Sequence, residues 1–267
     1  MAKLKKPNKN ATLHKIYHGY ITVTNLPKDV YFYNAAKLMK GINKGFGKIT
    51  FEYNSPDYKL YESIHDNIFM FSGAKTFQET LAMSNELIKD NRLVSFDEFK
   101  KSAGQLFDDY NESYLEAEYK TAISGGRMAE KWGEAMRNKK DLPYMKFVTA
   151  GDETVCEVCA PLDNICLPSD DDFWDTNYPP LHFRCNCDAQ LTDNEDDVSD
   201  QSEADVADRE SNSGRGGDKT FDVNVGKTGM VFSKDHPYFQ IPKEYHKLAE
   251  NNFNLPIPKN TGRYATL

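Results

Sequence analysis

The sequence predicts a mainly helical fold with a small α+β or loop module that is held together by a cysteine–histidine site. Three observations predict it. Apolar residues between positions 29 and 140 recur every three or four residues, which is the period of an amphipathic helix. Residues 151–188 contain all five cysteines and four prolines, so this part needs a cross-link to hold a shape. Residues 192–220 are acidic and almost free of large apolar side chains, as in a disordered linker.

The helical part is predicted to follow a flexible arm. Residues 1–28 are polar, with scattered lysines and no clear period. Helical spacing dominates residues 72–137. Ser95 can cap a helix there, and Glu98, three residues later, completes a capping box. We therefore expect helices throughout this part of the chain.

Two features mark the later part of the helical stretch and its end. Gly125 and Gly126 lie inside an apolar-periodic run and predict a kink or a break in that helix. Residues 144–149 predict a short strand. The sequence thus divides into a flexible arm (1–28), a helical domain (29–140), a Cys/His zinc-type module (141–191), a disordered acidic linker (192–220) and a C-terminal docking tail (221–267).

The charge is unevenly distributed. Residues 193–218 hold ten acidic and two basic residues, which accounts for the whole formal net charge of −8. The neutral remainder gives weak electrostatic grounds for general DNA binding. No apolar segment follows the basic start as a secretion signal requires. The run at residues 68–71 is far shorter than a membrane span. We expect a cytosolic protein without a membrane partner.

Five residues form the pattern that carries the chemistry. Cys156 and Cys159 make a Cys-x-x-Cys turn, and after 22 residues follow His182, Cys185 and Cys187. Zinc in structural sites takes four nitrogen or sulfur ligands at about 2.0 to 2.3 Å, which two such turns supply. In a cytosol, clustered cysteines favour a metal over disulfides. The spacing therefore predicts a structural Zn²⁺ ion.

These five residues compete for four positions. The first two cysteines and Cys185 are the preferred ligands. His182 and Cys185 suit a turn, whereas Cys185 and Cys187 point the same way if the chain is extended. The sequence favours His182 slightly and leaves Cys187 as a rival. Cys166 lies in the intervening loop without a partner at ligand spacing, and it is excluded.

Other chemistries could use the same cysteines. They could form disulfides, pack as small hydrophobes, or act in redox chemistry, which requires a thioredoxin-like strand–helix context. Catalysis by the metal would need an open coordination position and a base. Glu153 and Glu157 lie nearby, but acids beside a cysteine knuckle are more typical of solvated surface. We predict no catalytic residue and no enzyme activity.

The cysteine–histidine module resembles a known signature. Residues 144–152 lead to Cys-x-x-Cys-Ala-Pro-Leu-Asp at 156–163, and Pro-Pro-x-His-x-x-Cys-x-Cys closes the pattern at 179–187. This order is similar to the C-terminal signature of the Mu F-like phage head morphogenesis (minor capsid) proteins. The resemblance covers roughly residues 95–190. The cysteine–histidine part of the resemblance is specific to this family. The helical part alone would be weak support for it.

The chain departs from that signature at three positions. Asn186 stands where the family usually has Arg, Phe183 where it has Pro, and Asn164 where it often has Gly. These departures leave the five expected ligands in place.

The resemblance implies a structural protein of the phage head, assembled in the host cytoplasm and carried in the virion. Its expected partners are the portal protein, the major capsid protein and packaged phage DNA, in head assembly and in DNA packaging or delivery. Two other functions remain open on the sequence: a zinc-dependent hydrolase or nuclease, and a zinc-finger adaptor protein. An open metal position with a base in reach would favour the hydrolase or nuclease.

Overall fold

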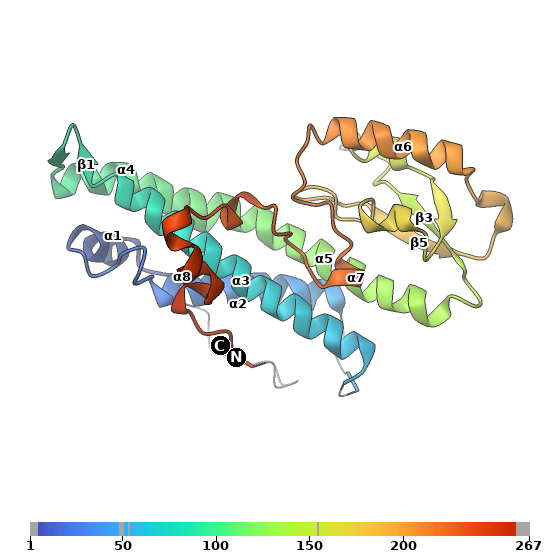
Figure 1. Cartoon of the computed structure of the whole chain (residues 1–267), viewed down its shortest axis with the longest axis horizontal. Coiled ribbons are helices and arrows are strands. Elements are labelled where there is room, and N and C mark those ends of the chain that lie inside the picture. The colour runs from blue at the N-terminus through green and yellow to red at the C-terminus, as the bar shows by residue number, and fades with distance from the viewer. Residues whose placement is uncertain (1–4, 48–50, 53, 154, 260–267) are drawn as a thin grey trace. The chain divides into compact units, whose positions relative to one another are not determined.

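The computed structural model describes residues 5–47, 51–52, 54–153 and 155–259. The chain falls into two compact units. Unit 1 holds residues 1–39, 68–119 and 237–267, and unit 2 holds residues 40–67 and 120–236. The expected class is confirmed in its coarse form, since helices dominate and the strands form only small sheets (Figure 1).

Helices supply most of the described structure, and none of them is long and apolar enough to cross a membrane. A π-helical segment, η1, joins α4 directly to α5. The helices are α1 Lys9–Tyr17, α2 Lys28–Phe46, α3 Pro56–Asn85, α4 Phe96–Asp108, η1 Asp109–Tyr114, α5 Leu115–Asn138, α6 Gln201–Gly214, α7 Val225–Thr228 and α8 His246–Glu250. The strands are β1 Ile88–Lys89, β2 Arg92–Leu93, β3 Tyr144–Val148, β4 Cys166–Pro168 and β5 Asp188–Thr192.

Helix α1 corrects the expectation of a flexible arm over residues 1–28. Asn8 caps its first turn, and Leu13 and Ile16 are fully buried against α4. The predicted capping box at the start of α4 is confirmed, with both Ser95 and Glu98 bonded as expected. A nine-residue helix buries too few side chains to show a clear period, so the sequence alone hid it. Residues 1–4 lie outside the described residues.

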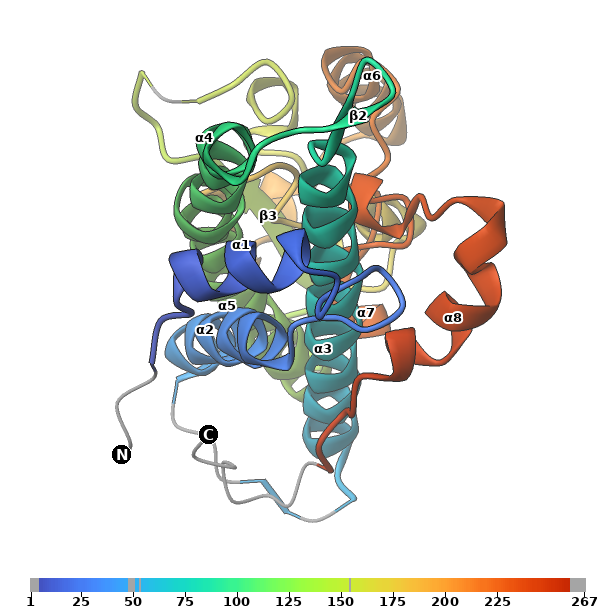
Figure 2. The same ribbon diagram turned by 90° about the vertical axis from the view of Figure 1, so that its left-hand side faces the viewer.

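The end of the chain also departs from the expected docking tail over residues 221–267. Residues 237–259 pack within unit 1, beside α3 (Figure 2). Phe253 stacks on Phe77 with ring centroids 4.8 Å apart. The Tyr31 hydroxyl donates to the Pro256 carbonyl at 2.8 Å. This segment therefore completes the core of unit 1, and residues 221–236 belong to unit 2.

Unit 2 contains a three-stranded antiparallel sheet in the order β4-β3-β5. The predicted strand at residues 144–149 is confirmed as β3, whose Met145 and Phe147 are fully buried. The predicted break at Gly125-Gly126 is wrong, because α5 runs through both residues. A Cβ atom at Gly126 would lie 2.4 Å from the carbonyl oxygen of Ile42. This glycine therefore allows α2 to approach α5 closely.

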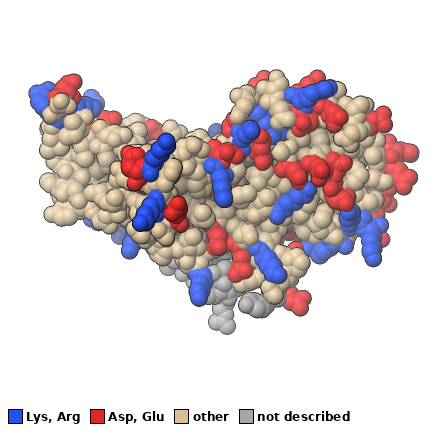
Figure 3. Space-filling view, viewed as in Figure 1, with Lys and Arg blue, Asp and Glu red and all other residues tan. Residues whose placement is uncertain are grey.

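Helix α6 corrects the expectation of a disordered acidic linker over residues 192–220. It packs on the short 3₁₀ helix η2, Ala160–Leu162, and buries Ala204, Ala207 and Ser211. These residues are small, so the buried face of α6 carries no large apolar side chain that would mark it in the sequence. The acids of α6 mostly face solvent. Figure 3 shows acidic side chains interspersed with Lys and Arg on this face of the molecule.

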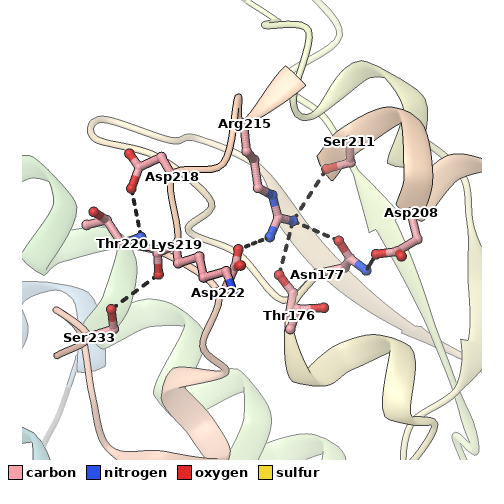
Figure 4. A network of polar contacts seen from close by, with 10 residues as sticks. All are labelled: Thr176, Asn177, Asp208, Ser211, Arg215, Asp218, Lys219, Thr220, Asp222 and Ser233. Atoms are coloured by element: carbon pink, nitrogen blue, oxygen red, sulfur yellow. Dashed lines mark hydrogen bonds and ion pairs between the residues drawn. The ribbon is translucent and has the colours of Figure 1, made fainter. Parts of the chain in front are cut away.

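Arg215, directly after α6, fixes this helix to the loop before the second cysteine pair. Its side chain is only 4% exposed and forms an ion pair with Asp222. It also donates to the Thr176 carbonyl at 3.1 Å and to the Asn177 side chain at 2.8 Å. Asn177 in turn donates to Asp208 on α6 at 2.7 Å (Figure 4). The acidic segment is thus tied into the fold by charge.

Candidate metal centre

The first cysteine pair lies on a tight turn that opens η2. The Cys159 and Ala160 amides both donate to the Cys156 carbonyl, at 3.1 and 2.9 Å. Cys159 is fully buried, whereas Cys156 is half-buried. The turn therefore directs two sulfur atoms toward one place, one from within and one nearer to solvent.

The second group of donors lies on another turn that leads into β5. The Cys185 amide donates to the His182 carbonyl at 3.2 Å. Arg184 takes a left-handed conformation, with φ of 64°, and this reverses the chain between the two ligands. The Arg184 amide also donates to Thr121 on α5 at 3.1 Å. The prediction of a turn at His182 and Cys185 agrees with this backbone.

Helix α5 supports this turn through two basic residues that the sequence analysis did not select. Arg127 donates to the Cys187 carbonyl at 3.0 Å. Lys131 forms an ion pair with Asp188 at 2.6 Å. The two are four residues apart and so share one helix face. The four-residue spacing of these basic residues is visible in the sequence. The sequence does not show which part of the fold the two side chains contact.

The structure brings all five predicted donors together. Their ligand atoms form two groups, Cys156–Cys159–His182 and Cys159–Cys185–Cys187, and within each group all atoms lie within 4.8 Å of one another. A tetrahedral zinc with Zn–S bonds of about 2.3 Å needs donors about 3.8 Å apart. Cys159 belongs to both groups, so the two turns meet at its sulfur. Cys166 belongs to neither group in the part of the chain that the structure describes.

The histidine is oriented as a metal ligand requires. Its Nδ1 atom lies 2.9 Å from the carbonyl oxygen of Phe183. A proton on Nδ1 leaves Nε2 as the metal donor, and backbone carbonyls commonly hold the second nitrogen of ligating histidines. The donor set therefore fits a zinc ion held by sulfur and nitrogen. No described structural feature selects between His182 and Cys187 as the fourth ligand.

Without a metal, three buried cysteines and the half-buried His182 share protons. The hydrogen bond from Cys159 lowers the pKa of Cys185, with further help from Cys187 and His182. The same contact with Cys185 raises the pKa of Cys159 and raises that of His182 to about 9. The cluster thus resembles one thiolate held by neighbouring donors. A divalent cation would replace the shared protons and release them as it binds.

The loop between the two turns has more core than its composition indicated. Trp174 and Tyr178 are both fully buried. The Tyr178 hydroxyl donates to the Met128 carbonyl of α5 at 2.8 Å, and the Trp174 indole N–H donates to the Pro168 carbonyl at 3.0 Å. The loop therefore has a packed core of its own. A metal bound at the donors would add to its stability and would not have to create its shape.

Comparisons with known proteins cover the same region. Residues 75–190 match the family model described as Phage Mu protein F like protein. A stretch of 69 residues is 38% identical to the putative capsid assembly protein F of Escherichia phage Mu. That alignment covers 26% of this chain and 15% of the relative. No solved structure matches significantly. All five candidate ligands lie inside the family match.

Proposed function

Because this chain belongs to the Mu F-like family through its residues 75–190, we propose that it acts in phage head morphogenesis as a structural protein of the head. The observation that carries the proposal is the gathering of five Cys/His donors inside the matched region. A metal held by these donors would cross-link two turns of unit 2, as structural metal sites do.

The proposed metal is a zinc ion held by Cys156, Cys159, His182 and Cys185. It stabilises unit 2 and takes no part in a reaction. Cys159 and Cys185 are buried and contact each other, and His182 contacts Cys185. Four protein ligands leave no position for a substrate or an activated water.

The proposed partners are the portal protein, the major capsid protein and packaged phage DNA. The name of the Mu relative, a putative capsid assembly protein, supports a capsid partner. The portal protein is proposed from the resemblance to the family alone. DNA is the weaker proposal, since the formal net charge of −8 provides no general attraction for phosphate. The acidic face of α6 favours instead a partner surface that carries Lys or Arg.

A phage complementation experiment tests the role in the head. The gene is deleted and replaced by the wild-type chain, by Cys159→Ser, or by Cys166→Ser as a matched control. We expect complete heads that contain the protein with the wild-type chain and with Cys166→Ser, and defective heads with Cys159→Ser. Normal infectious heads after complete deletion, or purified particles that lack the protein, would refute the proposed role.

A further inference from the structure

Unit 1 contains a buried polar cluster outside the metal centre. Glu79 on α3 is 1% exposed and Asn111 in η1 is 4% exposed. The Asn111 Nδ2 atom donates to the Glu79 Oε1 atom at 2.5 Å and also to the Phe107 carbonyl at 2.9 Å. Both hydrogens of this amide nitrogen are therefore used.

The other two oxygens of this pair lack a partner. Glu79 Oε2 and Asn111 Oδ1 are buried and unbonded among the described residues. Both accept hydrogen bonds if Glu79 is a carboxylate, so they cannot satisfy each other, and a buried unsatisfied group is costly. One proton on Glu79 removes the conflict, because a carboxylic acid can donate to the amide oxygen while it accepts from the amide nitrogen.

The charges around Glu79 lead to the same conclusion. Lys75, one turn earlier on α3, forms a buried ion pair with Glu118 of α5 at 2.5 Å. Tyr238 of the C-terminal segment donates to the same Glu118 side chain at 3.1 Å. The single ammonium group is thus matched by one carboxylate. An ionised Glu79 would place a second carboxylate beside it without a counter-charge, which burial strongly disfavours.

The remaining groups near Glu79 do not change this balance. Asp29 of α2 adds negative charge, and the hydroxyls of Tyr110 in η1 and of Tyr238 are neutral when protonated. Burial is the largest cause that raises the pKa of Glu79, to about 8, while Lys75 and Asn111 act in the opposite direction. Burial also raises the pKa of Glu118. We assign the proton to Glu79 because Glu118 holds the Lys75 ammonium.

We propose that Glu79 is a neutral carboxylic acid that forms a closed two-hydrogen-bond pair with Asn111, and that this pair is a pH-sensitive lock between α3 and the π-helical segment η1. The wider turn of a π-helix is uncommon and often marks a functional position. Here the π-helical segment carries Asn111, whose hydrogen bonds with Glu79 depend on the proton of that acid. Loss of that proton leaves two acceptor oxygens facing each other and loosens the junction of α4 and α5.

The sign of the pH effect follows from the raised pKa. A carboxyl with a raised pKa in the folded state contributes stability that is fully present below its ordinary pKa of 4.5. That stability is lost as the pH rises through the folded value of about 8. Each pKa unit corresponds to a factor of ten, so the unfolding constant rises up to about a thousandfold over this window.

Glu79→Gln tests the lock in the full chain, because glutamine keeps the shape and both hydrogen bonds of the neutral acid. We expect this variant to fold and to lose most of that rise in the unfolding constant between pH 5 and pH 8. Glu244→Gln, an exposed acid of unit 1, is the matched control and should retain the wild-type pH dependence. Equal pH dependence in wild type and Glu79→Gln, or failure of Glu79→Gln to fold, would overturn the proposal.

A direct measurement keeps the test independent of stability. ¹³C NMR of protein labelled at the glutamate Cδ position reports the ionisation of each side chain, and the Glu79 signal is the one missing in Glu79→Gln. At pH 6.5 we expect it at the position of a carboxylic acid. A carboxylate signal for Glu79 at this pH would contradict the proposal.

Discussion

At the scale of single residues, Cys159 holds the central place in the proposed metal centre. Its sulfur belongs to both donor groups, it is fully buried, and its amide closes the turn with Cys156. Cys166 offers a natural comparison, since it is also a buried cysteine of unit 2 but belongs to neither group. Substitutions at these two cysteines therefore distinguish the loss of a metal ligand from the loss of a buried thiol.

The substitution Cys159→Ser is expected to abolish zinc binding, whereas Cys166→Ser should leave it intact. Loss of a ligand should reduce zinc affinity by more than the roughly 10- to 100-fold effect of changes outside the ligand shell. Competition with a chromophoric chelator measures the affinity of each purified variant. Equal zinc affinity in the two variants would show that Cys159 is not a ligand.

A second pair of substitutions addresses the fourth ligand. If His182 binds the ion, His182→Ala should reduce zinc affinity by more than Cys187→Ser, whose effect should stay within the roughly 10- to 100-fold range of changes outside the ligand shell. The same chelator competition measures both. The opposite order would assign the position to Cys187 and leave the other three ligands unchanged.

At the scale of elements, α6 depends on one buried arginine. Arg215 contacts Asp222, Thr176 and Asn177, and its Nε atom has no partner among the described residues. A buried charge of this kind contributes to the stability of the fold mainly when all of its hydrogen-bond and ion-pair partners are present. The helix buries only small side chains, so the Arg215 contacts carry much of its attachment to unit 2.

Arg215→Ala should destabilise the chain by about 2 to 4 kcal/mol, because it leaves the buried polar partners of the arginine unsatisfied. Arg209→Ala, which removes an exposed arginine of α6, is the control and should change the stability by less than about 0.5 kcal/mol. Urea unfolding gives both values. Limited proteolysis should find the α6 region cut faster only in Arg215→Ala, and equal stability of the two variants would contradict this role.

The elements also show what the sequence could and could not predict. The capping box at Ser95 and strand β3 follow from local patterns and are confirmed. Helix α6 escaped prediction because its buried face consists of alanines and a serine, and an ionic network holds its end. The C-terminal segment was missed because its aromatic residues pack on helices far away in sequence, a contact that no local pattern contains.

The candidate site was predictable to a similar degree. The spacing singled out five candidate ligands, and the structure places them close together. Their supporting contacts were not predictable, because Arg127 and Thr121 lie on α5 and reach the donors only in the folded unit. The pair of Glu79 and Asn111 was hidden for the same reason.

At the scale of the whole molecule, we infer that the two units are stabilised in different ways. Unit 1 relies on helix packing, on a C-terminal segment that completes its core, and on a neutral buried acid. Unit 2 relies on a small sheet, on α6, and on the proposed zinc ion that joins the turn of residues 156–159 to the turn of residues 182–187.

Zinc-edge X-ray absorption of the purified full-length chain tests this account most directly, together with its metal content. The account predicts about one zinc ion per chain in a four-coordinate shell of three sulfurs and one nitrogen, at about 2.3 and 2.0 Å. A folded protein that binds no zinc when the metal is supplied, or a shell that contains a water oxygen in an open position, would contradict the proposed structural metal centre.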